Sequence, residues 1–226
     1  MKRSEINRAM KDAVRFMEEQ NFKLPPFAYW KKEEWENKGE EYREVRETML
    51  GWDITDFGHG DYCKIGLLMF TLRNGSYKMP DRYEKPYAEK ILIVGDGQVT
   101  PYHFHWKKME DIINRGGGDL LIQMYESTDD SEMSDGPVTV HMDGRVYQAE
   151  AGAIVRLKPG QSLTIMCGQY HKFWAEGGPV LVGEVSKVND DNIDNHFYDD
   201  KGRFPRVEED EEPYFYLFNE EPGAIA

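Results

Sequence analysis

Apolar residues near the N-terminus recur with the period of a helix. Between Ser4 and about Gln20 they form one stripe made of Ile6, Ala9, Met10, Ala13, Val14 and Met17. Positions three and four apart share one helix face, so the stripe predicts an amphipathic helix that Ser4 caps. Leu24-Pro25-Pro26 ends this helix, because proline interrupts helical hydrogen bonding. Residues 31–47 are charged and predict two short helical pieces separated at Gly39.

From about residue 50 the pattern changes to short apolar runs separated by turn residues such as Asn74-Gly75 and Asp143-Gly144. The runs are Ile65–Leu72, Ile91–Val94, Leu120–Tyr125, Val138–His141, Val146–Ala149, Ala153–Leu157, Ser162–Met166 and Val180–Val185. Short strands at this spacing are typical of an antiparallel sandwich or barrel, so the expected fold class is all-β dominated. We expect a helical arm over residues 1–50, packed on a β-barrel domain over residues 51–226 as one structural unit.

The C-terminal region combines an acidic run with an aromatic segment. Val207–Glu212 has five acidic residues after one valine, which predicts a solvated loop. Pro213–Phe218 is too apolar to remain exposed, so we expect it to pack on the barrel or on a second subunit.

The composition of the chain excludes some classes of binding partner but does not identify one. The 226-residue chain can bury a full core, and its net charge of −14 argues against nucleic acid and anionic membrane surfaces. No apolar run reaches membrane length and the N-terminus lacks the apolar segment of a secretion signal, so we expect a cytoplasmic protein. Cys63 and Cys167 are too few for a disulfide scaffold and predict reduced thiols.

The stretch Thr100–Glu110 carries the candidate chemistry. His103 and His105 are one residue apart, so on a strand their side chains point to the same face. Glu110 follows five residues later, close enough for the chain to bend and bring its carboxylate beside them. Lys90 opens the strand before a Gly-Asp-Gly turn, so we expect the histidines to lie on a hairpin paired with that strand.

His171 is the candidate for a fourth ligand. It follows a strand and a glycine-bearing turn, where a barrel partner of the histidine strand is needed. A lone histidine in this position is more often a satisfied core residue. Three imidazoles and one carboxylate suit Mn, Fe, Co, Ni or Zn and leave two octahedral positions open. Open positions are typical of a catalytic centre.

These residues resemble a known family at two levels. His-x-His-x4-Glu with a distant histidine resembles the two motifs of the cupin superfamily, although the stretch from Pro159-Gly160 to His171 is longer than usual. The blocks Glu89–Val94, Thr100–Gly118 and Gly183–Ser186 resemble the bacterial D-lyxose isomerase family, and the resemblance covers nearly the whole chain. It implies a cupin jelly-roll barrel, a homodimer, and a Mn-dependent isomerase that interconverts D-lyxose and D-xylulose, with some activity on mannose and fructose.

The chemistry of that reaction suggests roles for further residues. Aldose–ketose isomerisation moves a proton between C1 and C2, so it needs a general base beside the metal. We expect Glu184 to be this base, although exposure statistics alone favour a surface position for it. Lys90 is expected to reach the substrate oxygens, and Asp194 and His196 are reserve acid–base candidates.

We also expect side chains that flank the ligands to line the sugar pocket with Lys90. They are Tyr102, Trp106, Gln169 and Phe173, with plain core packing as the alternative for Trp106 and Phe173. A phosphosugar isomerase would need a cluster of cations. The nearby cations are scattered and interpretable as surface residues: Lys107, Lys108, Arg115 and Arg156. An unphosphorylated sugar is therefore expected.

Two other functions stay open. A cupin oxidoreductase or dioxygenase would use the same three histidines and one glutamate with a redox-active metal, but it needs no carboxylate base. A pocket position for Glu184 would therefore argue against it. A non-catalytic sugar-binding cupin would have little reason to keep an open-sided metal site.

Overall fold

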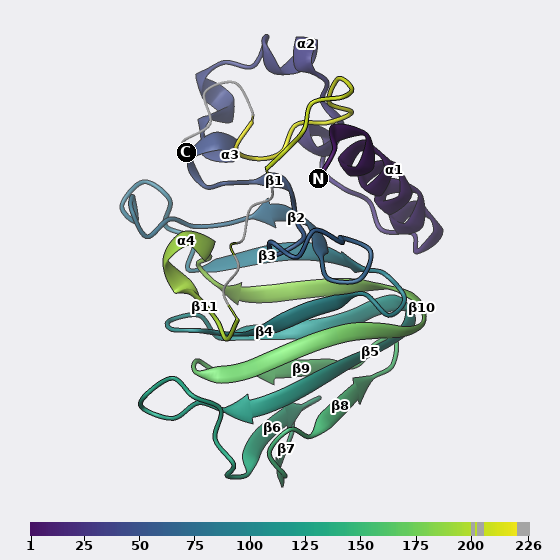
Figure 1. Ribbon diagram of the computed structural model, residues 1–226. Coiled ribbons are helices and arrows are strands. Elements are labelled where there is room, and N and C mark those ends of the chain that lie inside the picture. The colour runs from purple at the N-terminus through teal and green to yellow at the C-terminus, as the bar shows by residue number, and fades with distance from the viewer. Residues whose placement is uncertain (200–201, 203–205, 221–226) are drawn as a thin grey trace.

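Two long antiparallel strands join two layers of β-structure in this computed structural model, which describes residues 1–199, 202 and 206–220 (Figure 1). These strands, β5 (Glu110–Glu126) and β10 (Gln169–Lys187), pair along most of their lengths. The first layer adds β1 (Gly51–Thr55), β2 (Leu67–Arg73), β3 (Tyr87–Val94), β9 (Ser162–Ile165), β6 (Val138–Met142) and β7 (Arg145–Ala149). The second adds β11 (Asn195–Phe197), β4 (Val99–His105) and β8 (Ile154–Leu157). The result is a jelly-roll barrel.

Both long strands bend where they pass from one layer to the other, and the bends are built from glycine. Gly117 in β5 has a φ of 97°, and Gly177 and Gly178 in β10 have φ values of 79° and 126°, all in the region that disfavours side chains. A Cβ atom on Gly117 would lie 2.1 Å from the carbonyl oxygen of Pro179. Glycine is therefore required for the close approach of the two strands.

The pairing of β5 with β10 shifts by one residue at this bend. Glu176 lies opposite Asp119 and Val182 lies opposite Asn114, so β10 advances six positions where β5 advances five. As a consequence β10 changes the set of residues that faces the interior. Odd-numbered residues such as Phe173 are in the core before the bend, and even-numbered residues such as Val182 are in the core after it.

The predicted hairpin of the lysine strand and the histidine strand is wrong. β3 pairs with β2 and with the second half of β10, whereas β4 pairs with β11 and with the first half of β10. The Gly95–Gly97 turn thus crosses between the layers instead of joining neighbours in one of them. The backbone support of the histidines comes from β10, on which His171 lies opposite His103.

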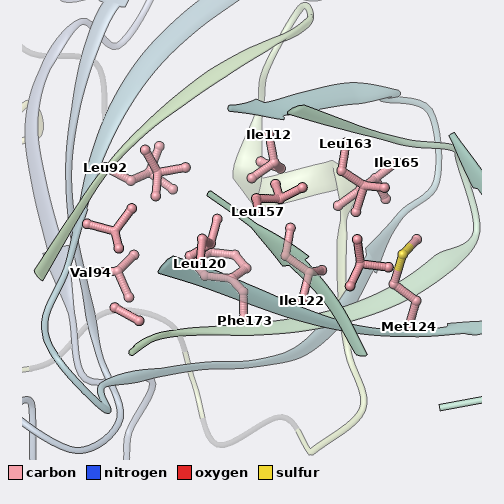
Figure 2. Close-up of a cluster of buried hydrophobic side chains, with 14 of the residues drawn as sticks. Leu92, Val94, Ile112, Leu120, Ile122, Met124, Leu157, Leu163, Ile165 and Phe173 are labelled. Carbon is pink, nitrogen blue, oxygen red and sulfur yellow. The ribbon is translucent and has the colours of Figure 1, made fainter. Parts of the chain in front are cut away.

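An apolar core fills the space between the layers (Figure 2). Its buried members include Leu92, Val94, Ile112, Leu120, Ile122, Met124, Leu157, Leu163, Ile165 and Phe173. Each fully buried side chain of this size contributes about 1.5–3 kcal/mol through removal from water. The polar site described below adjoins this core, which gives its side chains rigid support.

The N-terminal helices cover the outer face of the first layer (Figure 1). α1 (Arg3–Glu19) packs its apolar stripe against residues of β1 to β3 such as Trp52 and Phe70. The remaining helical pieces are η1 (Pro26–Tyr29), α2 (Lys32–Trp35), η2 (Glu40–Tyr42) and α3 (Arg43–Glu47). The predicted cap is wrong, because the helix starts one residue before Ser4, whose hydroxyl donates to Asp210 at 2.7 Å.

The acidic run of the C-terminal region is exposed, as predicted, but it is not free. The buried guanidinium of Arg3 forms ion pairs with Glu209 at 2.7 Å and with Glu220 at 2.5 Å. In Figure 1 the C-terminal segment accordingly runs beside α1. Phe215 and Leu217 join the apolar cluster under α1, which confirms the prediction that the aromatic segment packs on the barrel.

Two expectations drawn from composition concern the cysteines and membrane spans. Cys63 and Cys167 are both exposed and free. Among the described residues, none of the helices has the length and apolar character that crossing a membrane would require.

Candidate active site

The four predicted ligands converge at one end of the barrel interior. His103 and His105 extend from β4 and His171 from β10, and their ligand nitrogens all lie within 4.8 Å of one another. Glu110 is the first residue of β5. Its Oε1 atom is 3.3 Å from Nε2 of His171, and its Oε2 atom is 3.3 Å from Nε2 of His105.

Backbone carbonyls orient two of the imidazoles. Nδ1 of His103 lies 2.9 Å from the carbonyl oxygen of Pro101, and Nδ1 of His171 lies 3.0 Å from that of Gln169. A carbonyl only accepts hydrogen bonds, so each Nδ1 carries the proton and each Nε2 presents a lone pair to the cluster. Metal-binding histidines are commonly oriented in this way.

The donors fit a divalent metal ion. Within the described part of the chain, the buried Nε2 atoms of His105 and His171 have no hydrogen-bond partner, an arrangement that is costly unless something else binds there. Burial lowers the pKa of His103 well below its usual value, and the neighbouring imidazoles add to the effect. Burial and the charge of Lys108 likewise lower the pKa of His105. Clustered neutral imidazoles beside a carboxylate are ligands for Mn, Fe, Co, Ni or Zn.

Lys108 is the principal residue that the sequence analysis missed, because its interpretation as a surface cation is wrong. Its side chain is 2% exposed, and its Nζ atom is 2.9 Å from Oε2 of Glu110 and 2.9 Å from Oε1 of Glu184. Burial alone lowers the pKa of a lysine, but these carboxylates outweigh it and raise the pKa of Lys108 above its usual value. The residue is therefore a buried cation between the predicted metal ligands and Glu184.

Glu184 and Lys90 are direct neighbours across the β3–β10 pairing. The Nζ atom of Lys90 lies 3.5 Å from Oε1 of Glu184, and both side chains are at least nine-tenths buried. Lys90 also lies 3.5 Å from Oδ2 of Asp191, which follows β10. The strand bend explains how Glu184 faces inward together with His171.

These groups surround a cavity at one end of the barrel interior. Its polar side is lined by Lys90, Thr100, His103, His105, Lys108, Glu110, Glu184, Asp191 and Asn195. Its apolar side is lined by Phe57, Leu67, Met69, Leu92, Ile112, Phe173 and Phe197. The Phe197 ring also stacks on His103 with a centroid distance of 5.3 Å. A small polar molecule with C–H faces matches both sides.

The family model described as D-lyxose isomerase matches residues 1–221 of the sequence. The chain belongs to the D-lyxose isomerase family. It is 46% identical over 224 residues to the D-lyxose/D-mannose isomerase of Escherichia coli O157:H7, covering 97% of this chain and 98% of that protein. It is 43% identical over 223 residues to the D-lyxose/D-mannose isomerase of Serratia proteamaculans, covering 97% of each. As a member of this family, the chain is a sugar isomerase.

Solved structures show that the fold extends beyond the family. The L-ribose isomerase of Cellulomonas parahominis superimposes with a TM-score of 0.58 at 16% identity, over 92% of this chain and 98% of that one. The L-ribose isomerase of Acinetobacter sp. DL28 in complex with L-ribose gives a TM-score of 0.57 at 17% identity, over 89% and 94%. At these identities the likeness concerns the fold alone. The expected cupin jelly-roll barrel with an N-terminal helix is confirmed.

Three of the side chains expected to bind substrate do not line the cavity of this D-lyxose isomerase family member. Tyr102 and Trp106 alternate with the two histidines and so point to the other face of β4. Tyr102 donates to Oε1 of Gln123 at 2.5 Å, and Trp106 is 53% exposed. The side-chain amide of Gln169 donates to Glu126 and to the Thr139 carbonyl, whereas the contact with His171 is made by the backbone carbonyl of Gln169. Phe173 and Lys90 do line the cavity.

The reserve acid–base candidates also lie outside the cavity lining. Oδ1 and Oδ2 of Asp194 accept the backbone N–H groups of Lys107 at 2.7 Å and of Lys108 at 3.1 Å. His196 packs on the outer side of β4 against Phe104. In this position Asp194 is suited to hold the loop that carries Lys108, and not to transfer a proton. The sequence signal for Lys108 was its location between two ligands, three residues after His105 and two before Glu110.

Proposed function

We propose that this protein interconverts D-lyxose and D-xylulose, and D-mannose and D-fructose as a second pair, by moving a proton between C1 and C2 of the open-chain sugar. The observation that carries this proposal is the buried carboxylate of Glu184 in the same cavity as the histidine cluster. A cupin oxidoreductase would use the cluster but has no need of a base there. Family membership and the names of the two curated relatives support the choice of sugars.

His103, His105, Glu110 and His171 would hold a divalent metal ion, which we propose to be Mn²⁺. When bound, such an ion supplies Lewis-acid stabilisation of the negative charge that develops on the substrate oxygens. The buried Nε2 atoms of His105 and His171, which make no hydrogen bond within the described part of the chain, support this assignment.

Glu184 would act as the general base. Its carboxylate takes the proton from C2 of the aldose, so the C2–H bond breaks, and returns it to C1, where a new C–H bond forms. The net reaction also moves a proton from O2 to O1. Lys90 faces the same space as Glu184, and its ammonium would donate a hydrogen bond to these oxygens. The ammonium of Lys108, which already contacts Glu110, Glu184 and Asn189, would hold Glu184 in place.

The apolar side of the cavity would protect this proton from exchange with water. Phe57, Phe173 and Phe197 line it, and aromatic faces also pack well against the C–H surfaces of a sugar. The two lysines that line the cavity are already paired with Glu110, Glu184 and Asp191, so the charge of neither is available to pair with a phosphate. Arg156 is paired with Asp119 and Glu176 at the surface. An unphosphorylated sugar is therefore the proposed substrate.

The proposal includes a homodimer that acts on free sugar in the cytoplasm. Light scattering of the purified protein tests the dimer directly. A mass of one chain at micromolar concentration would contradict it.

The first experiment is turnover of D-lyxose by protein stripped of metal and then refilled with Mn²⁺. We expect ketose formation to be lost on stripping and restored by Mn²⁺, and His171→Ala to bind less metal and form no ketose. If the protein binds metal but forms no ketose, the result would favour the oxidoreductase. Protein that binds no stoichiometric metal would refute the proposed centre.

A further inference from the structure

Asn189, which follows β10, contacts both active-site lysines through one atom. Its Oδ1 atom accepts hydrogen bonds from Nζ of Lys90 at 2.8 Å and from Nζ of Lys108 at 3.1 Å. A neutral amide oxygen has two lone pairs, so it can hold two ammonium groups without adding charge. Asn189 is 6% exposed and is not among the described residues that line the cavity. It therefore contacts the two lysines from outside the cavity.

Asn74 fixes the backbone of Asn189. The N–H of Asn189 donates to Oδ1 of Asn74 at 3.0 Å, and Nδ2 of Asn74 donates to the carbonyl oxygen of Asn189 at 2.8 Å. Nδ2 of Asn74 also donates to the carbonyl oxygen of Thr48 at 3.1 Å. Asn74 is 1% exposed. These two hydrogen bonds hold the backbone of Asn189 as a neighbouring strand would. They therefore fix the direction in which its side-chain amide points.

The contact completes the hydrogen bonding of Lys108. Its ammonium has three N–H donors, and three acceptors lie within reach: Glu110 at 2.9 Å, Glu184 at 2.9 Å and Asn189 at 3.1 Å. Without the amide oxygen, one donor would have no partner and the two neighbouring lysines would repel each other. Their flexible stems would then settle in new positions relative to Glu184.

We propose that Asn189, anchored by Asn74, is a positioning residue for the isomerisation, and that its amide oxygen sets where the Lys90 and Lys108 ammonium groups stand relative to Glu184. The inference rests on the proposed function and adds to it a residue that does not touch the substrate. Groups that orient catalytic side chains in this way affect turnover more than substrate binding when the geometry they hold matters in the transition state.

The test compares three variants with the wild-type protein loaded with Mn²⁺. Asn189→Leu keeps the size and removes the acceptor, Asn189→Asp keeps an acceptor oxygen, and Asn192→Ala changes an exposed residue of the same segment. We measure kcat and KM for D-lyxose separately, together with metal content and melting temperature. For Asn189→Leu we expect kcat to fall about 10- to 100-fold with a smaller change in KM and unchanged metal content.

The other variants show whether the oxygen is responsible. Asn189→Asp should recover a large part of the lost kcat, and Asn192→Ala should match the wild type. Asn74→Ala releases only the backbone of Asn189, so it should lower kcat less than Asn189→Leu, and it serves as the test if that variant does not fold.

Several results would overturn the inference. They are a kcat of Asn189→Leu within about twofold of wild type, an equal loss in Asn189→Asp, or a loss of metal that accounts for the lost activity. A lower melting temperature with unchanged kcat would assign Asn189 to stability alone. A wild-type protein that forms no ketose would instead refute the proposed function, and this inference with it.

Discussion

The ammonium of Lys108 lies 2.9 Å from the carboxylate of Glu184, although 76 positions separate the two residues in the sequence. The same ammonium lies 2.9 Å from Glu110. Lys108 thus stands between a carboxylate of the ligand cluster and the carboxylate proposed as the base. Without this cation, two buried carboxylates would face each other across the cavity.

Lys108→Met should reduce both activity and stability. Removal of one member of a buried ion pair costs about 3–5 kcal/mol, because the remaining charges lose their partner. We expect the kcat/KM for D-lyxose to fall by at least about 100-fold, because Glu184 loses the buried cation that holds it in place. Lys107→Met is the matched control, since Lys107 is the adjacent residue and is exposed. Equal activity of the two variants would remove Lys108 from the mechanism.

Glu184→Gln should abolish turnover and retain the metal. The change preserves size and removes the proton acceptor, so kcat should fall about 100- to 10,000-fold, the range for general acid–base groups. Metal content measured on the same sample separates loss of the base from loss of the centre. Glu176→Gln, an exposed residue beside the bend of the same strand, should leave kcat unchanged. Substantial turnover by Glu184→Gln would contradict the role of Glu184.

The cavity lining predicts which aromatic residues affect substrate binding. Phe173→Leu, which changes a cavity wall, should raise the KM for D-lyxose several-fold. Trp106→Leu and Tyr102→Phe should leave kcat/KM within about twofold of wild type, because these side chains lie on the other face of β4. A large KM effect of Trp106→Leu in steady-state kinetics would show that Trp106 reaches the sugar.

Arg3 links the two ends of the chain, so Arg3→Met should destabilise the protein. Its pairs with Glu209 and Glu220 are partly solvated, and we expect a loss of about 1–3 kcal/mol and a melting temperature lower by several degrees. Arg8→Met changes an exposed arginine of the same helix and should have little effect. If both variants melt at the wild-type temperature, the contact does not stabilise the fold.

The same link should depend on pH. The hydrogen bond from Arg3 lowers the pKa of Glu209 below its ordinary 4.5, so the unfolded chain binds this proton more readily than the folded one. The stabilisation is therefore complete above about pH 4.5 and is lost as the pH falls through the lower, folded-state pKa. Denaturant titrations of wild type and Glu209→Gln between pH 6 and pH 3 should converge toward low pH. Parallel curves would contradict the assignment.

Local patterns were sufficient to predict most strands and the four side chains that the fold brings together as candidate ligands. His103 and His105 alternate on one strand, and Glu110 follows closely in the chain. The same alternation places Tyr102 and Trp106 on the opposite face from the histidines. The pairing of β3 and β4 with different parts of β10 depends on contacts far apart in sequence, which local patterns do not encode. The burial of Lys108 depends on Glu184 for the same reason.

The one-residue shift in β10 limits how this chain can vary. At this turn Gly177 is exposed and Gly178 is half-buried, and surface turns ordinarily accept insertions and deletions. Here His171 precedes the turn and Glu184 follows it, an odd number of positions later, yet both must face the same interior. With the one-residue shift retained, deletion of a single glycine would put the two residues an even number of positions apart and turn either the ligand or the base outward. Function therefore constrains the number of residues at this turn more strongly than is usual for a turn at the protein surface.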